Sequence, residues 1–559
     1  MTMKVFKKMA NSLSIISKGL ILLSLGLMLI PQITLAADGD ILTGWSEEGY
    51  QFKMQVISEA DKTANLYGYY KTNYGGIPCV DQNISGVITI PAESEGYKIV
   101  AVGNDAFAGC AKLTEVKLPE GIKTFGFDAF VACYALERIR IPSTAIDLYD
   151  GEGWNIFSGC RSLKQIEVAE GNQYYDSRNG CNAIIRKNGN VLIVGCVTTV
   201  IPDDVAEIGT SAFQDQTELR EISLPPSVKI LNGNAFAGVP LTSIDLSNVR
   251  QIGFGVFQNC KDLTNVTFGD ELETIGELSF HTCPIKELRL PNSLKTIGNS
   301  AFQSCTQIES LDIPKSVETI GGEAFSWCDG LKELYIPANI DTIGYRTFYY
   351  CKNVERITIG KNVCFIGSDA FAGSEKLKEV VSYIKEPFPI EQWAFRSRYG
   401  DVPNPFETAV LYVPKGTRTQ YAALEGWKEF LRIKEFDPTA NIIVSTKAEG
   451  LGSMSIGGIY EIGNEITLAA SSEEGWMFKG WMIDGATVST DVEYTLTVAE
   501  DITITAVFDK DPSAIQATRS EGATAEGYYS IDGKKQNTLQ VGVNIVRMSD
   551  GTSRKILVK

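Results

Sequence analysis

The sequence predicts an elongated, β-rich solenoid, in which short rungs of chain stack along one axis. A phenylalanine returns about every 23 residues through the middle of the chain, and in eight repeats a cysteine follows three residues later. A fixed period of this length is typical of repeats that bury their apolar faces only against their neighbours. The recurring side chains are Phe107, Phe130, Phe157, Phe213, Phe236, Phe257, Phe280, Phe302, Phe325, Phe348, Phe371 and Phe395.

One repeat, residues 331–351 (LKELYIPANIDTIGYRTFYYC), indicates how each rung forms. Leu334 and Ile336 alternate with polar neighbours, so they point inward while the neighbours point outward, because strand side chains have a period of two. Pro337 lacks an N–H and ends the strand. Phe348 then closes the rung. Stacked rungs therefore place a column of phenylalanines in the core, where each buried ring stabilises the fold by roughly 1.5–3 kcal/mol.

The repeat pattern L-x-x-I-x-I-P-x-S-V-x-x-I-G-x-x-A-F-x-x-C resembles the BspA-type leucine-rich repeat of bacterial surface proteins. Residues 288–305 and 311–328 carry the pattern nearly whole, and the resemblance covers roughly residues 86–436. It implies an exported cell-surface protein with a binding or adhesion role. It implies no catalytic residue. Within this region, residues 86–110 resemble the start of such arrays, 171–196 a longer variant rung, and 411–430 a closing segment.

The N-terminus is typical of a secretory signal peptide. Four lysines precede or flank an apolar run at 19–30, and Thr34-Leu35-Ala36 offers a small-residue cleavage site. The run is too short to span a bilayer. A retained amphipathic anchor is the alternative. Cleavage after Ala36 removes four lysines and no acid, so the net charge falls from −17 to −21.

The strongly negative net charge argues against nucleic acid and anionic membranes as partners, because both are also negatively charged. No membrane insertion is expected after signal cleavage. The chain has no Walker loop, no dinucleotide-binding glycine pattern and no EF-hand spacing, so no cofactor is expected. His281 is the one histidine and stands in no motif. The sequence therefore predicts no enzyme, although paired carboxylates are available among the 68 acids.

The twelve cysteines have spacings that argue against disulfides. Cysteines in register would be separated by about 4.8 Å, the distance between neighbouring strands, whereas disulfide Cβ atoms lie about 3.8 Å apart. A ladder of buried thiols is the better interpretation. Cys181 and Cys196 lie off this ladder, and their pairing is left open.

Residues 441–509 show a different period-two pattern that resembles a small B-repeat of bacterial surface proteins. Trp476 and Trp481 lie between its expected strands and either pack its core or form an aromatic platform for sugars. A hydrolase hidden in this segment is a further alternative. The last residues predict three short strands with a turn at 549–551 and resemble the sorting domain of type IX secretion cargo. A plain terminal strand cap is the alternative reading of that tail.

The predicted organisation is thus a solenoid with an N-terminal cap, then a small β domain and a short β-sandwich-like tail. The expected segments are a signal peptide (1–36), a cap (37–85), the solenoid (86–398), its closing segment (399–437), the B-repeat-like domain (438–510), a linker (511–527) and the sorting-like tail (528–559).

The outward positions of the rung strands vary from rung to rung while the inward ones do not. A recognition surface on a fixed scaffold has this pattern, although solvated charge without a ligand explains it equally. The leading hypothesis is an adhesin-like binding protein on the exterior of a Gram-negative outer membrane, docking host matrix or another cell's surface protein. The alternative is a non-catalytic carbohydrate-binding component of a glycan-uptake system. The candidate contact residues are Arg140, Glu167, Glu221, Asp245, Glu287, Arg289, Asp312, Glu333, Tyr335 and Arg356.

Overall fold

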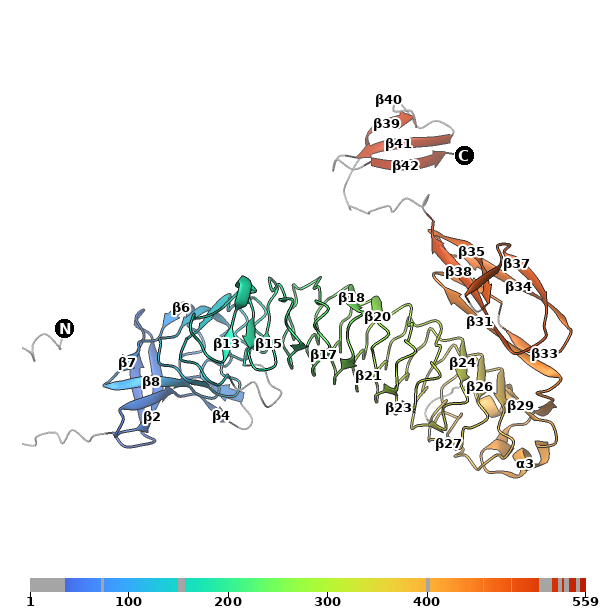
Figure 1. Cartoon of the computed structure of the whole chain (residues 1–559), viewed down its shortest axis with the longest axis horizontal. Coiled ribbons are helices and arrows are strands. Elements are labelled where there is room, and N and C mark those ends of the chain that lie inside the picture. Colours follow the sequence, from blue (N-terminus) through green and yellow to red (C-terminus); the bar gives the residue numbers. More distant parts are fainter. Residues whose placement is uncertain are drawn as a thin grey trace, which may run out of the picture.

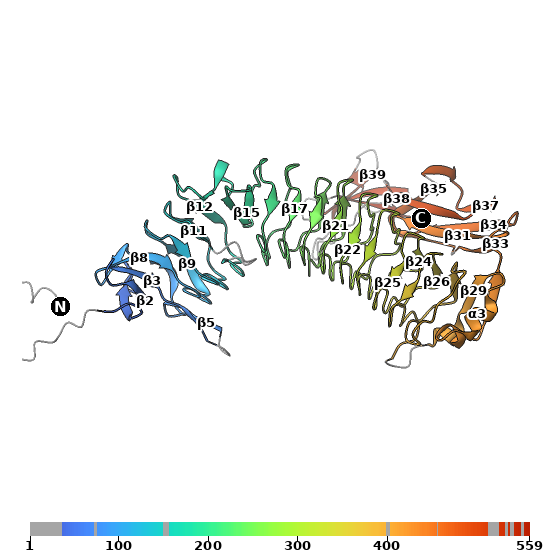
Figure 2. The ribbon, with the colours of Figure 1, turned by 60° about the horizontal axis from the view of Figure 1, so that its bottom comes forward.

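The chain forms a long, curved rod of stacked rungs, with a small β domain against one side of its C-terminal third (Figures 1 and 2). The predicted solenoid is therefore confirmed. The signal-peptide prediction falls on residues outside those described, apart from Ala36. The computed structural model describes residues 36–71, 75–148, 156–398, 403–455, 457–483, 485–511, 525–530, 535–536, 542–548 and 553–558.

A cap covers the first rung. Strands β1 (Ile41–Trp45), β2 (Gln51–Ser58) and β3 (Thr63–Leu66) pair antiparallel, and β3 then pairs parallel with β8 (Tyr97–Val102) and so with β10 (Thr124–Phe125). The inward side chains of β2 and β3 are buried in the same cluster as the first rung phenylalanines. The open end of the core is thereby closed to water.

Most rungs contribute one strand to a first layer of parallel strands, which forms three separate sheets and whose outward side we call the sheet face. Its strands pair in register from rung to rung. They are β6 (Ser85–Thr89), β9 (Lys112–Lys117), β11 (Arg138–Ile141), β12 (Gln165–Val168), β18 (Ser243–Leu246), β20 (Asn265–Phe268), β24 (Glu333–Ile336), β26 (Arg356–Ile359), β28 (Glu379–Ser382), β29 (Val410–Pro414) and β30 (Ile433–Phe436).

A second layer of parallel two-residue strands, most of them Thr-Ile or a similar pair, runs along another side of the rungs, and its last two strands form a separate sheet. The isoleucine or leucine of each pair points into the core. These strands are β16 (Glu207–Ile208), β17 (Ile230–Leu231), β19 (Gln251–Ile252), β21 (Thr274–Ile275), β22 (Thr296–Ile297), β23 (Thr319–Ile320), β25 (Thr342–Ile343) and β27 (Phe365–Ile366).

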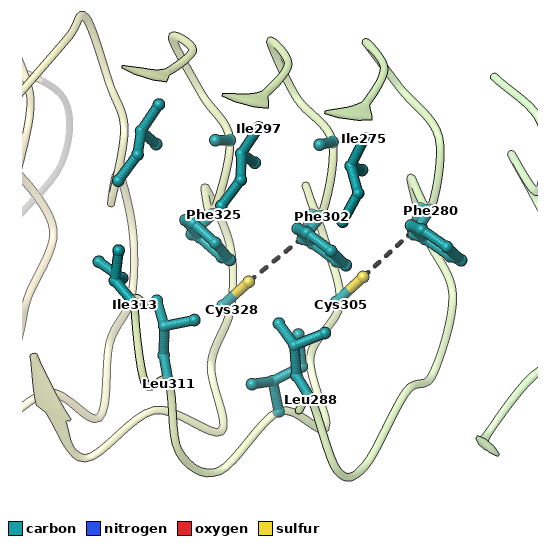
Figure 3. Packing of buried hydrophobic residues seen from close by; sticks show 14 of the residues in the cluster. Ile275, Phe280, Leu288, Ile297, Phe302, Cys305, Leu311, Ile313, Phe325 and Cys328 are labelled. Atoms are coloured by element: carbon teal, nitrogen blue, oxygen red, sulfur yellow. Dashed lines mark hydrogen bonds between the residues drawn. The ribbon is translucent and has the colours of Figure 1, made fainter. Parts of the chain in front are cut away.

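The rung phenylalanines stack between the two layers, as Figure 3 shows for Phe280, Phe302 and Phe325. Successive ring centroids lie 5.0–5.7 Å apart with interplanar angles of 2–20°. The exposed fraction of Phe302 is 0%. The predicted phenylalanine column is confirmed, and it consists of two stacks separated by the variant rung.

The cysteine ladder is confirmed as a row of buried, unbridged thiols. The sequence predicted only the packing of these thiols, whereas every ladder cysteine after Cys110 also donates a hydrogen bond to the phenylalanine carbonyl of an earlier rung. Cys305 Sγ lies 3.1 Å from the Phe280 carbonyl oxygen of the preceding rung, and Cys328 Sγ lies 3.3 Å from that of Phe302 (Figure 3). Cysteine therefore fills a small apolar space and also gives a buried carbonyl a second donor. Cys181 and Cys196 are separate free thiols.

The variant rung interrupts the stack after Phe157. Strands β13 (Tyr175–Asp176), β14 (Ile184–Arg186) and β15 (Val191–Val194) pair antiparallel, and β15 then joins the second layer. A Cβ on Gly195 would stand 2.1 Å from the Phe213 ring, so only glycine lets the backbone close against that ring.

A closing segment seals the far end of the core. It contains α2 (Pro405–Thr408), α3 (Arg418–Ala423) and η2 (Trp427–Glu429). Trp427 is fully buried, and Phe430 meets Phe395 edge-on at 5.4 Å. Aromatic side chains thus end the phenylalanine column by covering its last ring.

The small β domain, residues 441–511, has two packed sheets. One sheet has the order β33 (Gly458–Glu461), β31 (Asn441–Glu449), β38 (Ile502–Lys510), β35 (Trp476–Ile483) and β36 (Ala486–Ser489). The other has the order β32 (Gly452–Met454), β34 (Glu465–Ser472) and β37 (Glu493–Thr497). Its core includes Trp481, Ile504 and Phe508.

The described residues near the C-terminus form one antiparallel sheet of order β40-β39-β41-β42. The three expected strands are present, with a short fourth, and they make a single layer where a sandwich-like tail was expected. The expected turn at 549–551 and most of the linker lie outside the described residues. Nowhere in the described chain is there a helix with the length and apolarity needed to cross a bilayer. The strands of this segment are β39 (Ala525–Ser530), β40 (Lys535–Gln536), β41 (Gly542–Met548) and β42 (Ser553–Val558).

Truncation of one stacked ring tests the column. Phe302→Ala should cost about 3–5 kcal/mol, because a well-packed core cannot collapse around the lost ring. Hydrogen exchange should accelerate in the mutated rung and its two neighbours first, because repeats interact mainly with their neighbours. Uniform acceleration along the whole rod would contradict this one-dimensional coupling.

Thiol labelling tests the cysteine ladder. Burial raises the pKa of Cys351 to about 12 and raises those of Cys283 and Cys328 as well, so these thiols stay protonated at pH 8. Iodoacetamide should therefore modify only Cys364, the one exposed cysteine, in the native protein. After unfolding, mass spectrometry should find all twelve modified. Native labelling of several ladder cysteines would contradict the structure.

Candidate binding face and interdomain groove

The predicted outward columns stand in register on the sheet face. Arg140 lies opposite Glu167, and Asp245 lies opposite Thr267. Further along, Tyr335 lies opposite Thr358 and then Val381. Since the strands run parallel, side chains of neighbouring rungs that share a position also share a line along the rod.

The N-terminal part of this face is open to solvent. Arg140, Glu167, Glu221 and Asp245 are all exposed. The Arg140 guanidinium lies 3.2 Å from Glu120 and 3.3 Å from Glu167, which holds it between two acids. Such exposed pairs add little stability, so these side chains are available to a partner at little cost to the fold.

The C-terminal part of the face is covered by the small β domain, which the sequence did not lead us to expect. Arg356 is 6% exposed, and Thr358 and Val381 are 2% and 0% exposed. Arg356 bonds Glu379 at 2.5 Å and lies 3.8 Å from Glu333. Burial raises the pKa of Glu333, although Arg356 acts against that shift. Of the predicted contact residues, Glu333 and Arg356 are therefore not on an open surface.

Polar contacts hold the domain on the face. Lys447 Nζ lies 2.5 Å from Asp312, and Arg289 lies 3.4 Å from Glu449. Asp501 accepts a hydrogen bond from the Ile443 amide within its own domain at 2.7 Å. It also accepts one from the Tyr383 hydroxyl of the solenoid at 3.3 Å.

An apolar cluster lies beneath these contacts. Val381 packs with Phe436 and Ile443, all nearly fully buried, and Tyr383 and Tyr412 pack around them. The connection is short, because the turn after Phe436 leads directly into β31 at Asn441. Val381 is the outward valine of its column, so its burial requires a covering element.

The contact leaves a groove of about 880 Å³ beside it. One wall is the sheet face at Glu287, Arg289 and Asp312, and the other is the small β domain at 447–451 and Trp476. Leu288, Leu290 and Leu451 add apolar surface, and Lys286, Lys332, Lys376 and Lys510 add cations. Grooves between domains that combine apolar surface with a few polar groups are the usual places for ligands.

The two tryptophans of the small β domain have different environments. Trp481 is 0% exposed and donates its Nε1–H to the Asp491 carbonyl at 3.0 Å, so it packs the core. Trp476 is half-buried against the core and lines the groove. The core prediction is therefore confirmed for Trp481, whereas Trp476 packs partly against the core and also lines the groove.

The described residues contain no group of three or more histidine, cysteine or acidic side chains arranged as metal ligands. His281, which follows Phe280 in the sequence, is half-buried, and burial lowers its pKa. The predicted contact residues Glu287, Arg289, Asp312 and Tyr335 remain exposed, and the first three line the groove. The site thus offers charge, aromatic surface and shape for binding.

Comparison with known families decides the identity of the repeats. The model described as the BspA type leucine rich repeat region matches residues 88–185, 195–308 and 273–399, more than half of the chain. The chain belongs to the BspA-type leucine-rich repeat family. Residues 442–512 match the divergent InlB B-repeat domain, so the small β domain is such a B-repeat.

Several solved structures similar to this BspA-type chain are bacterial proteins. A leucine-rich repeat protein from Bacteroides ovatus is 23% identical, with a TM-score of 0.44, over 71% of this chain and 93% of its own. A leucine-rich cell surface protein from Faecalibacterium prausnitzii is 19% identical, with a TM-score of 0.38, over 71% and 95%. The pneumococcal vaccine antigen PcpA is 16% identical, with a TM-score of 0.31, over 72% and 100%. No curated protein matched.

The sequence analysis did not predict the groove, although two features of the sequence indicate that the face is covered there. The outward column of the BspA-type solenoid changes from charged residues to Thr358, Val381 and Tyr412 in its last rungs. The chain from Phe436 to Asn441 is also too short to hold two domains far apart. An apolar outward column beside a short connection predicts a covered face.

A buried charge should detach the small β domain. Val381→Asp places a carboxylate in the apolar cluster, where an unpaired charge is strongly unfavourable. Hydrogen exchange at β26 and β28 should then accelerate, and X-ray scattering should show a larger maximum dimension. Thr267→Asp is the matched control, because Thr267 occupies the same column on the open face. If hydrogen exchange and the maximum dimension changed equally in the two variants, the packing of the small β domain on the sheet face would be contradicted.

Proposed function

We propose that this protein is an exported cell-surface binding protein of an adhesin type. It docks an extended extracellular protein, of the host matrix or of another cell, along the sheet face. The observation that carries the proposal is the pair of outward columns, which change chemistry at each rung on an otherwise constant scaffold. Many weak contacts at regular spacing suit an extended partner, whose affinity depends on a few well-placed residues.

The open face and the groove have complementary roles in this proposal. Exposed charges such as Arg140 and Asp245 attract and align the partner, since rim charges act mainly on association. The groove then holds part of the partner between Arg289 and Trp476, where less water surrounds each contact. The small β domain therefore acts as one wall of the binding site.

Export is part of the same proposal. The basic, apolar and small-residue segments at 1–36 support a signal peptide. The resemblance of the final strands to type IX sorting domains supports passage across a Gram-negative outer membrane. The protein then acts on the outer side of that membrane, released or attached. We assign it no catalytic step.

Glycan capture is the second candidate function, and Trp476 supports it. Its half-buried ring faces a groove that also carries lysines and acids. An aromatic ring with polar groups around it is suited to carbohydrate as well as to protein. In this version the protein belongs to a glycan-uptake system and holds the polymer without cleaving it.

Paired charge reversals test the sheet face. The mature chain carrying Arg140→Glu and Asp245→Lys should bind its matrix-protein ligand at least about tenfold more weakly, a loss of roughly 1.4 kcal/mol. Immobilised collagen, laminin and fibronectin serve as probes in surface plasmon resonance. The difference in affinity between the variant and the original chain should become smaller at high salt, because salt screens the interactions of exposed charges.

The matched control reverses charges elsewhere on the rod. Lys295→Glu and Glu318→Lys alter two exposed positions next to the second layer and leave the net charge unchanged, as the test pair does. Binding should be unaffected in the control. Equal loss in both variants, or binding that survives the test pair, would overturn the sheet-face proposal.

A further inference from the structure

A patch of aromatic and cationic side chains lies apart from the sheet face, on the side of the rungs formed by the segments around the rung phenylalanines, which we call the A-F segments after their Ala-Phe pairs. We call it the aromatic–arginine patch and define it as Trp327, Tyr345, Arg346, Tyr350, Trp393 and Arg398. We propose that it binds an acidic polysaccharide, with a sugar ring stacked on Trp327 and the sugar's carboxylate or sulfate held by neighbouring cations. The proposal concerns a different surface and ligand class from the sheet face, so it is independent of the proposed function.

The fold does not require aromatic side chains in this patch. The residue two positions after the rung phenylalanine has a left-handed backbone in every rung except the last, with φ of 62° at Trp327 and 56° at Tyr350. Other rungs place Asn259, Thr282 or Ser304 there. Bulky residues rarely adopt this conformation, and such outliers gather at functional sites.

The backbone hydrogen bonds are the same with either kind of residue. The Trp327 amide donates to the Tyr349 carbonyl of the next rung at 2.7 Å, and the Thr282 amide donates to that of Gln303 at 2.9 Å. A small polar residue therefore satisfies the rung equally well. The backbone therefore does not explain why residues 327 and 350 are aromatic, and the explanation has to come from the contacts of their rings.

The two rings form a supported platform. Trp327 and Tyr350 stack with centroids 4.5 Å apart at 28°, and the Tyr350 hydroxyl lies 3.1 Å from Ser397 Oγ. A Cβ on Gly373 would stand 2.5 Å from the Tyr350 ring, so this glycine makes room for the ring on its other side. In the preceding rung, Ser304 occupies the same position as Trp327 and is too small to cover the indole. Trp327 is only partly buried, so its indole keeps exposed surface that a ligand can reach.

Arginines connect the platform to the next rungs. The Arg346 guanidinium lies 4.6 Å from the Tyr349 ring centroid and 4.8 Å from that of Tyr345. The Asp369 side chain is 3% exposed and lies 3.9 Å from Arg346 and 3.4 Å from Arg398. One buried carboxylate therefore positions two guanidinium groups, which orders the patch before any ligand arrives.

Arg398 extends the network to a second indole. Its guanidinium lies 5.1 Å from the Trp393 ring centroid, and its Nη2 donates to Ser368 Oγ at 2.7 Å. Arg346 Nε is buried and faces Asp369 Oδ2 at 3.9 Å, which is an ion-pair distance but too long for a hydrogen bond.

The charges indicate which sugars fit. Lys352 and Arg396 lie 5.7 and 5.9 Å from the centroids of Trp327 and Trp393. Neither forms an ion pair with a residue in the described ranges. In a chain of net charge −17, two uncompensated cations beside aromatic rings mark a local site for an anion. Guanidinium and ammonium groups bind carboxylate and sulfate through charge-assisted hydrogen bonds.

Two other ligand classes fit less well. A quaternary ammonium ligand would lie close to the cations Arg346, Lys352 and Arg398, and like charges repel. A stable protein partner buries about 800 Å² on each side, which is large for a patch confined to a few rungs. A pyranose presents an apolar C–H face to a ring and polar groups at its edge, as this patch requires.

Binding of defined oligosaccharides by the mature full chain tests the proposal. The probes are oligogalacturonate and hyaluronan for carboxylates, chondroitin sulfate and heparin fragments for sulfates, and maltooligosaccharides as neutral controls. At least one acidic probe should bind in isothermal titration, and the maltooligosaccharides should bind at least tenfold more weakly. The carboxylate and sulfate series decide which anion the site prefers.

Trp327→Ser should weaken acidic-glycan binding at least tenfold, and serine is the residue that the preceding rung already has there. Phe254→Ser, at an exposed aromatic outside every proposed site, should leave it unchanged. Trp476→Ser reports whether the groove binds the glycan instead. Lys352→Gln with Arg396→Gln should weaken binding several-fold and reduce its salt dependence. Hydrogen exchange confirms that each variant is folded.

Several outcomes would overturn the proposal. These are the absence of acidic-glycan binding, equal affinity for neutral sugars, or full acidic-glycan binding by Trp327→Ser. Loss of acidic-glycan binding in Trp476→Ser but not in Trp327→Ser would also overturn it. Loss of a protein ligand in Trp327→Ser, with no glycan bound, would assign the patch to protein recognition. The paired reversals at Arg140 and Asp245 are measured separately, so either proposal can fail while the other stands.

Discussion

The stacking of one phenylalanine per rung is the interaction on which the rest of this structure depends. Rings 5.0–5.7 Å apart keep both layers of parallel strands in register, because neighbouring strands in a sheet lie at a similar spacing. The cysteine thiols complete the arrangement by bonding the phenylalanine carbonyls of the preceding rung, as Cys305 does with Phe280. The glycine at 195 and the aromatic residues of the closing segment mark the places where the stack has to pause or end.

A core built in this way leaves two kinds of position free to vary. The outward strand positions form the sheet face, and the left-handed positions beside each phenylalanine form the A-F side of the rungs. Neither contributes much to stability, so both can be used for recognition. The charged columns at Arg140 and Asp245 and the aromatic–arginine patch around Trp327 are examples on two sides of one scaffold.

The small β domain changes what the sheet face can do. Its packing over Val381 and Phe436 buries part of the face and converts the neighbouring part into a groove. Ion pairs such as Lys447 with Asp312 then fix the two walls relative to each other. A ligand in this groove would contact both domains at once, which a bare solenoid cannot offer.

The sequence alone determined the solenoid, the buried phenylalanines and thiols, and the outward columns, because each follows from a local period repeated many times. It also indicated that Trp481 packs a core. Only the tertiary structure decided which outward residues are accessible, since Glu333 and Arg356 are covered by a domain more than eighty residues away in the chain. The same holds for the aromatic–arginine patch. Trp327, Asp369 and Trp393 occupy different rungs, and their proximity arises from the stacking of those rungs rather than from any spacing in the sequence.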